Sequence, residues 1–268
     1  GPVGNDSADD AYAMIPIELD WTKIGVAYSN SATRVKITHF PVIHARKGSM
    51  GYKVEWQTPE GTNLSMIYTS DTKPETNSVN QAINGGRGID VFIHEMVVPP
   101  SVWTYKNMGL NAPPATNSPV YPSYIAGVQT LTTVQNSSHT PQGAFGYLLS
   151  LVTPKPRLTV ATHFPVADDT VASALQSVQA HTNVEMGTDL IWSFDLMVLR
   201  VFPDRIEQRR AVVSDYCFNP PVQLSTNAAN MPKYNDGTNS NPYAQIDLTT
   251  QIPATNADGS VNYRLDGF

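Results

Sequence analysis

Five residues of the kinds that bind metals or transfer protons stand at the ends of apolar segments. They are His44, Asp71, Glu95, His139 and His163. In α/β proteins, ligands bind where strand ends and the following loops converge, so we expect these side chains to point into one crevice. Imidazole nitrogens and carboxylate oxygens suit zinc, iron or manganese, and a metal with an open position makes hydroxide available near neutral pH. The pattern therefore indicates a hydrolytic metal centre.

Each of these residues also has a purely structural interpretation. His44 and Asp71 are of the types found in surface turns, and His163 would then be a hydrogen-bonded core histidine. His139 precedes a predicted helix, where a histidine is often a solvated cap residue. Glu95 is either a residue that orients a metal ligand or simply a buried, hydrogen-bonded carboxylate. The sequence context of the five residues has to decide between the two interpretations.

Composition narrows the function classes. The 268 residues include 17 basic and 23 acidic side chains, a net charge of −6 at pH 7, with no basic cluster that would follow a phosphate backbone. Nucleic acid is therefore not the expected partner. Cys217 is the only cysteine, so the chain has no intrachain disulfide or thiolate cluster. No run approaches the roughly 18 apolar residues of a membrane span, and the low charged content favours a periplasmic or secreted location.

Strands and helices are predicted in an order that delivers the polar residues to strand ends. A helix is expected at 76–83, before Gly85 and Gly86. Two strands after residue 189 read as a hairpin around Pro203 and Asp204. The expected strands cover residues 34–44, 51–58, 64–69, 88–96, 157–162, 190–202 and 206–213. The alternation of strands and helices predicts an α/β fold.

Two further helices and two irregular regions complete the picture. Thr140 as N-cap and Pro141 at the first helical position open one helix, and Asp168 or Asp169 caps the next. Residues 101–134 have no convincing period and read as a long insertion that walls a substrate site. We divide the chain into a lead-in segment at 1–33, a domain at 34–215 and an irregular C-terminal tail at 216–268.

Four ordered motifs resemble one branch of a known family. His44 before Met50-Gly51-Tyr52-Lys53-Val54, and Tyr68-Thr69-Ser70-Asp71-Thr72, are similar to segments of the ribonuclease Z and arylsulfatase-like branch of the metallo-β-lactamase-fold metallohydrolases. Phe92-Ile93-His94-Glu95 resembles that branch's Leu-Ile-His-Glu strand. Ser138-His139-Thr140, followed by Val160-Ala161-Thr162-His163, resembles its His-Thr helix and Thr-His strand. Ser70 departs from the pattern, because the family has glycine there.

The resemblance implies a fold, an activity and roles for four residues. The fold would be the second half of an αββα metallo-β-lactamase-like sandwich, plus the irregular tail. His44 would bind a first metal, His163 a second, and Asp71 would bridge them, with His139 as a proton donor or oxyanion stabiliser. Two zinc ions are implied, with iron or manganese as alternatives, and hydroxide held between the metals would attack a small ester, lactone, phosphodiester or sulfate.

One large departure from the family limits this expectation. The His-x-His-x-Asp-His segment that supplies most of the family's metal ligands does not occur in this sequence. We therefore expect the site to be completed by an N-terminal half, belonging to the same protein or to a second chain. A small-molecule substrate is expected, and a homo-oligomer is compatible with the sequence.

Two alternative interpretations of the sequence remain possible. The first is a non-catalytic binding protein that kept the fold and lost the metals, which the missing segment favours. The second is a secreted all-β module in which the histidine matches are accidental. Helices near residues 140–152 and 169–181 would contradict the all-β reading.

Overall fold

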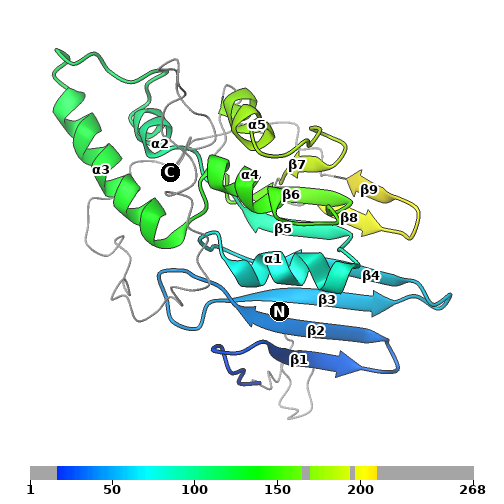
Figure 1. Cartoon of the computed structure of the whole chain (residues 1–268). Coiled ribbons are helices and arrows are strands. Elements are labelled where there is room, and N and C mark those ends of the chain that lie inside the picture. The colour runs from blue at the N-terminus through cyan, green and yellow to red at the C-terminus, as the bar shows by residue number, and fades with distance from the viewer. Residues whose placement is uncertain (1–16, 165–169, 194–196, 210–268) are drawn as a thin grey trace, which may run out of the picture.

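The chain forms a mixed sheet of seven strands in the order β1-β2-β3-β4-β5-β6-β7, with five α-helices among the described residues (Figure 1). The structure is a computed structural model, and it describes residues 17–164, 170–193 and 197–209. The sheet strands are β1 Gly25–Asn30, β2 Val35–Pro41, β3 Met50–Gln57, β4 Asn63–Tyr68, β5 Val91–Glu95, β6 Leu158–Thr162 and β7 Leu190–Trp192. The architecture is therefore α/β, as the sequence predicts.

The sheet has an antiparallel half and a parallel half that meet at β4. β1 to β4 pair antiparallel through short connections, whereas β4 to β7 pair parallel. Parallel neighbours need crossover segments, and helices α1 Thr76–Ile83, α4 Gln142–Ser150 and α5 Val171–Gln179 lie in these connections. The carboxyl ends of β4, β5 and β6 therefore lie side by side along one edge of the sheet, which we call the carboxyl end.

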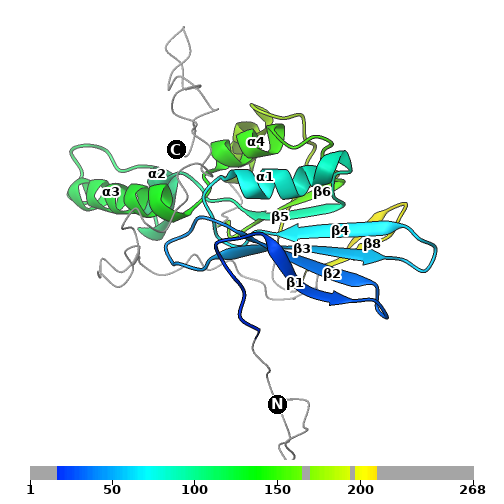
Figure 2. The same cartoon turned by 60° about the horizontal axis from the view of Figure 1, so that its bottom comes forward.

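The three crossover helices cover one face of the sheet (Figure 2). The main core lies between these helices and the sheet. It includes Phe92 of β5 and Phe145 of α4, both fully buried. Helices α4 and α5 cross closely because Gly146 has no side chain: a Cβ there would lie 2.8 Å from the Val178 Cα and carbonyl oxygen. Replacing this glycine would push the two helices apart.

The opposite face of the sheet is covered only in part by the described residues. There the hairpin of β8 Val198–Val201 and β9 Ile206–Arg209 packs on a second cluster that contains Val91, Val160 and Ile191. The antiparallel half of this face keeps large apolar side chains in contact with solvent. Tyr28, Trp56 and Tyr68 are each about two-fifths exposed, at 43%, 39% and 43%.

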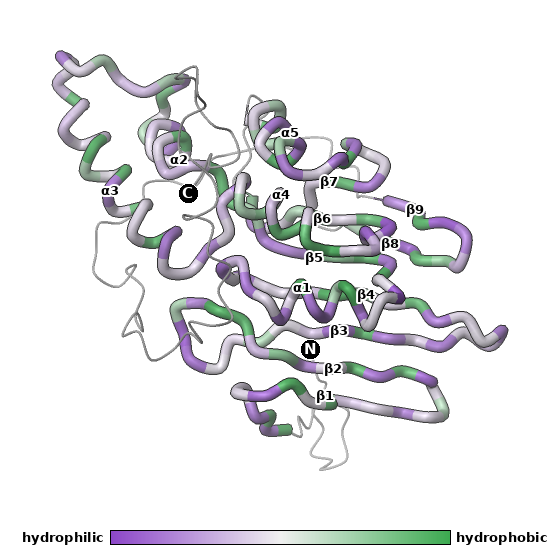
Figure 3. The backbone as a smooth tube through the Cα atoms, in the orientation of Figure 1, coloured by the Kyte–Doolittle hydropathy of each residue, from purple (hydrophilic) through white to green (hydrophobic). Residues whose placement is uncertain are grey.

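Helices α2 Pro100–Asn107 and α3 Tyr121–Ser138 pack on each other and project from the sheet as an arm (Figure 1). The sequence prediction of an irregular segment at 101–134 is therefore wrong. The pattern hid the helices because α3 mixes hydrophilic and hydrophobic residues along its length without one continuous apolar stripe (Figure 3). Its buried residues Tyr124, Leu131, Gln135 and Ser138 follow helical spacing, but only two of them are apolar.

Several predicted elements are confirmed and others are corrected. The helix at 76–83 has the predicted bounds, the hairpin around Pro203 forms, and α4 and α5 contradict the all-β reading. The predicted strand at 190–202 divides into β7 and β8, and strand β1 forms within the lead-in segment, which showed little periodicity. The capping by Asp168 or Asp169 and the C-terminal tail at 216–268 lie outside the described residues. None of the described helices is long and apolar enough to cross a membrane.

The cap predicted for α4 is also wrong. Pro141, not Thr140, is the N-cap, and the helix begins at Gln142. The Thr140 hydroxyl instead donates a hydrogen bond to the Thr72 carbonyl oxygen at 2.6 Å. The Thr140 side chain therefore forms a hydrogen bond with a distant segment instead of capping the helix, which is the role that local sequence rules predict.

Candidate metal centre

The carboxyl end gathers all five of the predicted polar residues. Glu95 is the last residue of β5, His163 directly follows β6, and Asp71 lies three residues beyond β4. His139 stands between α3 and α4, and His44 lies in the loop between β2 and β3. Three neighbouring parallel strands thus each deliver one ionisable residue to the same edge, where α/β proteins usually bind ligands.

Asp71, His139 and His163 form a group with the composition of a metal site. One ligand atom from each of the three residues lies within 4.8 Å of the others. The Asp71 Oδ2 and His163 Nε2 atoms are 3.6 Å apart. Two ligands of one tetrahedral zinc, with bonds of about 2.1 Å, would be separated by about 3.4 Å. The spacing of this pair therefore fits a shared ion.

His44 extends the group on the other side of His139. The rings of His44 and His139 meet edge to face with centroids 5.3 Å apart, and those of His139 and His163 stack with centroids 5.2 Å apart. The Nδ1 atom of His44 is 2.9 Å from the Ser138 carbonyl oxygen, which fixes Nδ1 as the protonated nitrogen. The Nε2 atom of His44 is then left as the nitrogen that can bind a metal.

His139 is held by a buried carboxylate. Its Nδ1 atom is 2.7 Å from the Glu95 Oε2 atom, and the Glu95 side chain is completely buried. The second carboxylate oxygen, Oε1, accepts a hydrogen bond from the backbone N–H of Thr72. The sequence is compatible with two roles for Glu95. The structure shows a buried, hydrogen-bonded carboxylate that orients a histidine of the site.

Burial favours the neutral forms of the ionisable side chains at the site. It lowers the pKa of His44, His139 and His163, with Asp71 acting in the opposite direction on all three. Burial also raises the pKa of Glu95, helped by the charge of Asp71 and opposed by backbone N–H groups of Thr72 and Thr140. Neutral imidazoles are the form that binds metals, so desolvation prepares these rings as ligands.

The backbone at the site departs from ordinary strand geometry. Ser70 and His163 have positive φ angles of 60° and 56°, a conformation that favours glycine. A glycine would adopt the backbone conformation of Ser70 at less steric cost. Backbone strain of this kind tends to gather at functional sites, where the surrounding structure enforces it.

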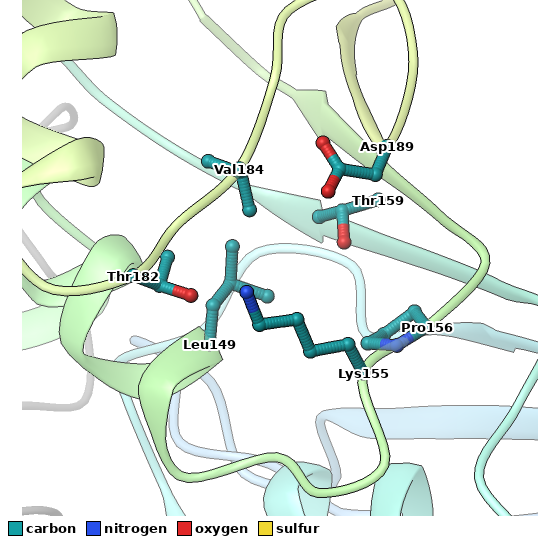
Figure 4. Close-up of a pocket in the computed structure, with 7 residues that line it drawn as sticks. All are labelled: Leu149, Lys155, Pro156, Thr159, Thr182, Val184 and Asp189. Carbon is teal, nitrogen blue, oxygen red and sulfur yellow. The ribbon is translucent and has the colours of Figure 1, made fainter.

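Two cavities lined by described residues lie away from this group. One of about 340 Å³ sits at the opposite, amino end of the strands and is lined by Arg87, Asp90 and Arg157 among others. Another, of about 10 Å³ and large enough for a single water molecule, lies beside Lys155, Thr159 and Asp189 (Figure 4). Neither contains a histidine, so neither competes with the carboxyl end as a metal site.

Sequence reasoning missed one residue that the structure places at the centre of the site. Thr72 follows Asp71 directly and is completely buried. Its position within the Ser-Asp-Thr turn could have signalled a structural role, but its partners come from distant segments.

Comparison of the chain with protein-family models gives no match, and comparison with curated proteins gives none either.

Proposed function

We propose that this chain supplies part of the active site of a metal-dependent hydrolase with a metallo-β-lactamase-like fold. The observation that carries the proposal is the convergence of Asp71, His139 and His163, with His44 and Glu95 beside them, at the carboxyl ends of three parallel strands. The order of these residues along the chain agrees with the resemblance to the ribonuclease Z and arylsulfatase-like branch. Neither line of support depends on the other.

The donor set fits zinc. As the resemblance implies, His44 Nε2 would bind a first metal and His163 Nε2 a second, and ions held there would supply Lewis acids and lower the pKa of water. Asp71, in the turn after β4, would bridge the two ions by the same resemblance. Iron and manganese accept the same donors and remain alternatives.

His139 has the connections of a proton donor. Glu95 accepts from Nδ1, so Nε2 is the atom directed at substrate, and the two oxygens of Glu95 hold the ring in one orientation. To act as a proton donor the ring must carry a second proton on Nε2, and the buried carboxylate of Glu95 would stabilise this imidazolium; Nε2 would then give that proton to the leaving group and regain one from water. The substrate is proposed to be a small ester, lactone, phosphodiester or sulfate.

The site needs more ligands than this chain provides, and the fold leaves room for them. The described residues cover the antiparallel half of one sheet face only in part, and Tyr28, Trp56 and Tyr68 are exposed there. A second sheet packed there would complete the αββα sandwich. We propose that it comes from an N-terminal half of the same protein or from a second chain, and that it brings the missing ligands. A periplasmic or secreted location remains a prediction from composition.

Zinc titration of the full 268-residue chain tests the proposal. We expect the chain alone to bind zinc only weakly, because it lacks the segment that supplies most of the ligands, and Asp71→Asn to weaken that binding by about 10-fold or more because a charged ligand is lost. Competition with a chromophoric chelator measures both affinities. Asp90→Asn is the matched control, since Asp90 lies at the amino end and pairs with Arg157. Equal zinc binding by both variants and by the unmodified chain would refute the metal site.

The non-catalytic alternative is favoured by the absence of the His-x-His-x-Asp-His segment. Activity separates the two candidates once the missing half is supplied. The reconstituted protein should hydrolyse chromogenic esters or phosphodiesters in a zinc-dependent way, and Asp71→Ala should abolish that activity. Zinc binding without turnover in the complete protein would favour the binding protein.

A further inference from the structure

We infer that Thr72 is the positioning residue of the candidate metal centre, because it joins the separate segments that carry the ligands and the proton donor. The inference rests on the proposed function for its chemical meaning. The geometry on which it stands does not depend on a metal.

Three parts of Thr72 reach three different segments. The Oγ1 atom accepts a hydrogen bond from the backbone N–H of Ile43 at 3.0 Å, one residue before His44. The backbone N–H donates to Glu95, and the carbonyl oxygen accepts from the Thr140 hydroxyl at 2.6 Å, one residue after His139. One small residue thus ties the loop of His44, the carboxylate behind His139 and the start of α4 to the turn that carries Asp71.

The hydroxyl of Thr72 is fully used. Besides accepting from Ile43, it donates to the Lys73 carbonyl oxygen at 2.9 Å, while the Lys73 N–H donates to the Ile43 carbonyl oxygen at 2.8 Å. The two loops are therefore linked by a closed set of bonds. Only Ser and Thr carry a single group that can donate and accept at this position in so little space.

Because these hydrogen bonds are buried, removing one of them should change the positions of the loops that they join. Thr72 and Thr140 are both completely buried, so water cannot replace a bond that is removed. Losing the Thr72 hydroxyl would leave the Ile43 N–H without its partner and let the His44 loop shift. Residues that hold metal ligands in place typically change metal affinity by 10- to 100-fold when they are lost.

The test uses four variants of the full chain. Thr72→Val removes the hydroxyl but keeps the shape, Thr72→Ser keeps the hydroxyl, and Thr140→Val removes the donor to the Thr72 carbonyl. Thr69→Val is the matched control: Thr69 is equally buried in the same turn, and its hydroxyl bonds only to the neighbouring Ser70 carbonyl oxygen at 3.1 Å.

Amide hydrogen exchange of the metal-free protein is measured first. Thr72→Val should speed exchange of the Ile43 N–H by about 10-fold or more, the effect of losing one buried hydrogen bond, and Thr140→Val should speed exchange at the start of α4. Thr72→Ser and Thr69→Val should leave exchange near Ile43 within about threefold of the unmodified chain. Unchanged exchange at Ile43 in Thr72→Val would overturn the inference, whatever the protein binds.

Zinc affinity is measured next on the same proteins. Thr72→Val should weaken zinc binding by about 10- to 100-fold, whereas Thr69→Val should not, and Thr72→Ser should restore affinity. A chain that binds no zinc at all would refute a metal site built by this chain's own residues, yet the exchange result would still decide whether Thr72 links the loops. Equal loss of affinity in Thr72→Val and Thr69→Val would show general destabilisation and would overturn the positioning role.

Discussion

The two ends of strands β4, β5 and β6 both carry ionisable residues, but these residues are arranged differently at each end. At the amino end, Arg157 pairs with Asp90 at 2.7 Å and Arg87 lies 3.7 Å from Glu55, with solvent beside each pair. At the carboxyl end, Glu95 and His139 are buried and bonded to each other, and Asp71 Oδ2 lies 3.6 Å from His163 Nε2. Paired, exposed charges add little to stability, whereas buried groups that converge point to function.

Replacing one glutamate at each end should give the largest difference in the free energy of unfolding. Glu95→Ala would leave the Thr72 N–H and His139 Nδ1 buried without a partner and should destabilise the protein by about 3 kcal/mol. Glu55→Ala removes only partly exposed ion pairs and should cost less than about 1 kcal/mol. Urea unfolding at pH 7 measures both. Similar losses would mean that the two ends do not differ in the way we describe.

A pH-dependent contrast of intermediate size is expected from His94. It is completely buried between Phe92 and Phe145, burial lowers its pKa to about 4, and its Nε2 atom has no hydrogen-bond partner. The unfolded ring has an ordinary pKa of about 6.5. Between these values the unfolded state binds more protons, so this residue reduces stability as pH falls from about 6.5 toward 4.

Replacing the ring with a non-titrating one should remove this dependence. His94→Phe keeps an aromatic ring between its neighbours, and its stability relative to the unmodified chain should rise by about 2 kcal/mol between pH 7.5 and pH 5. Because Glu75, whose pKa burial raises to about 7, is present in both proteins, its opposite contribution cancels in the difference. A difference that stays constant with pH would show that His94 does not titrate as described.

The smallest effect should come from the positive φ angle of Ser70 in the turn at the carboxyl end. Ser70→Gly suits the positive φ angle, whereas Ser70→Ala removes the hydroxyl without relieving strain. We expect the glycine variant to be more stable than the alanine variant by about 1 kcal/mol in thermal or urea unfolding. The reverse order would indicate that the turn is not held in this conformation.

Most of the fold was predictable where one local rule sufficed. Strands β2 to β6 and helix α1 follow apolar runs that end at Gly, Pro or polar residues, so their positions could be predicted to within a few residues. The arm at 101–134 could not, because α3 buries polar Gln135 and Ser138 as well as apolar residues. Thr140 shows the same limit, since its hydroxyl serves a distant carbonyl oxygen and not its own helix.

The sequence by itself determined which residues could do chemistry. His44, Asp71, Glu95, His139 and His163 stand at the ends of segments whose type follows from local pattern, and the chain order of their motifs implied a role for four of them. Only the tertiary structure decided their neighbours: Glu95 behind His139, Ser138 beneath His44, and Thr72 joining the loops. Hydrogen bonds between residues tens of positions apart depend on how strands align and helices cross. The local sequence pattern does not predict that alignment, so it could not predict these bonds.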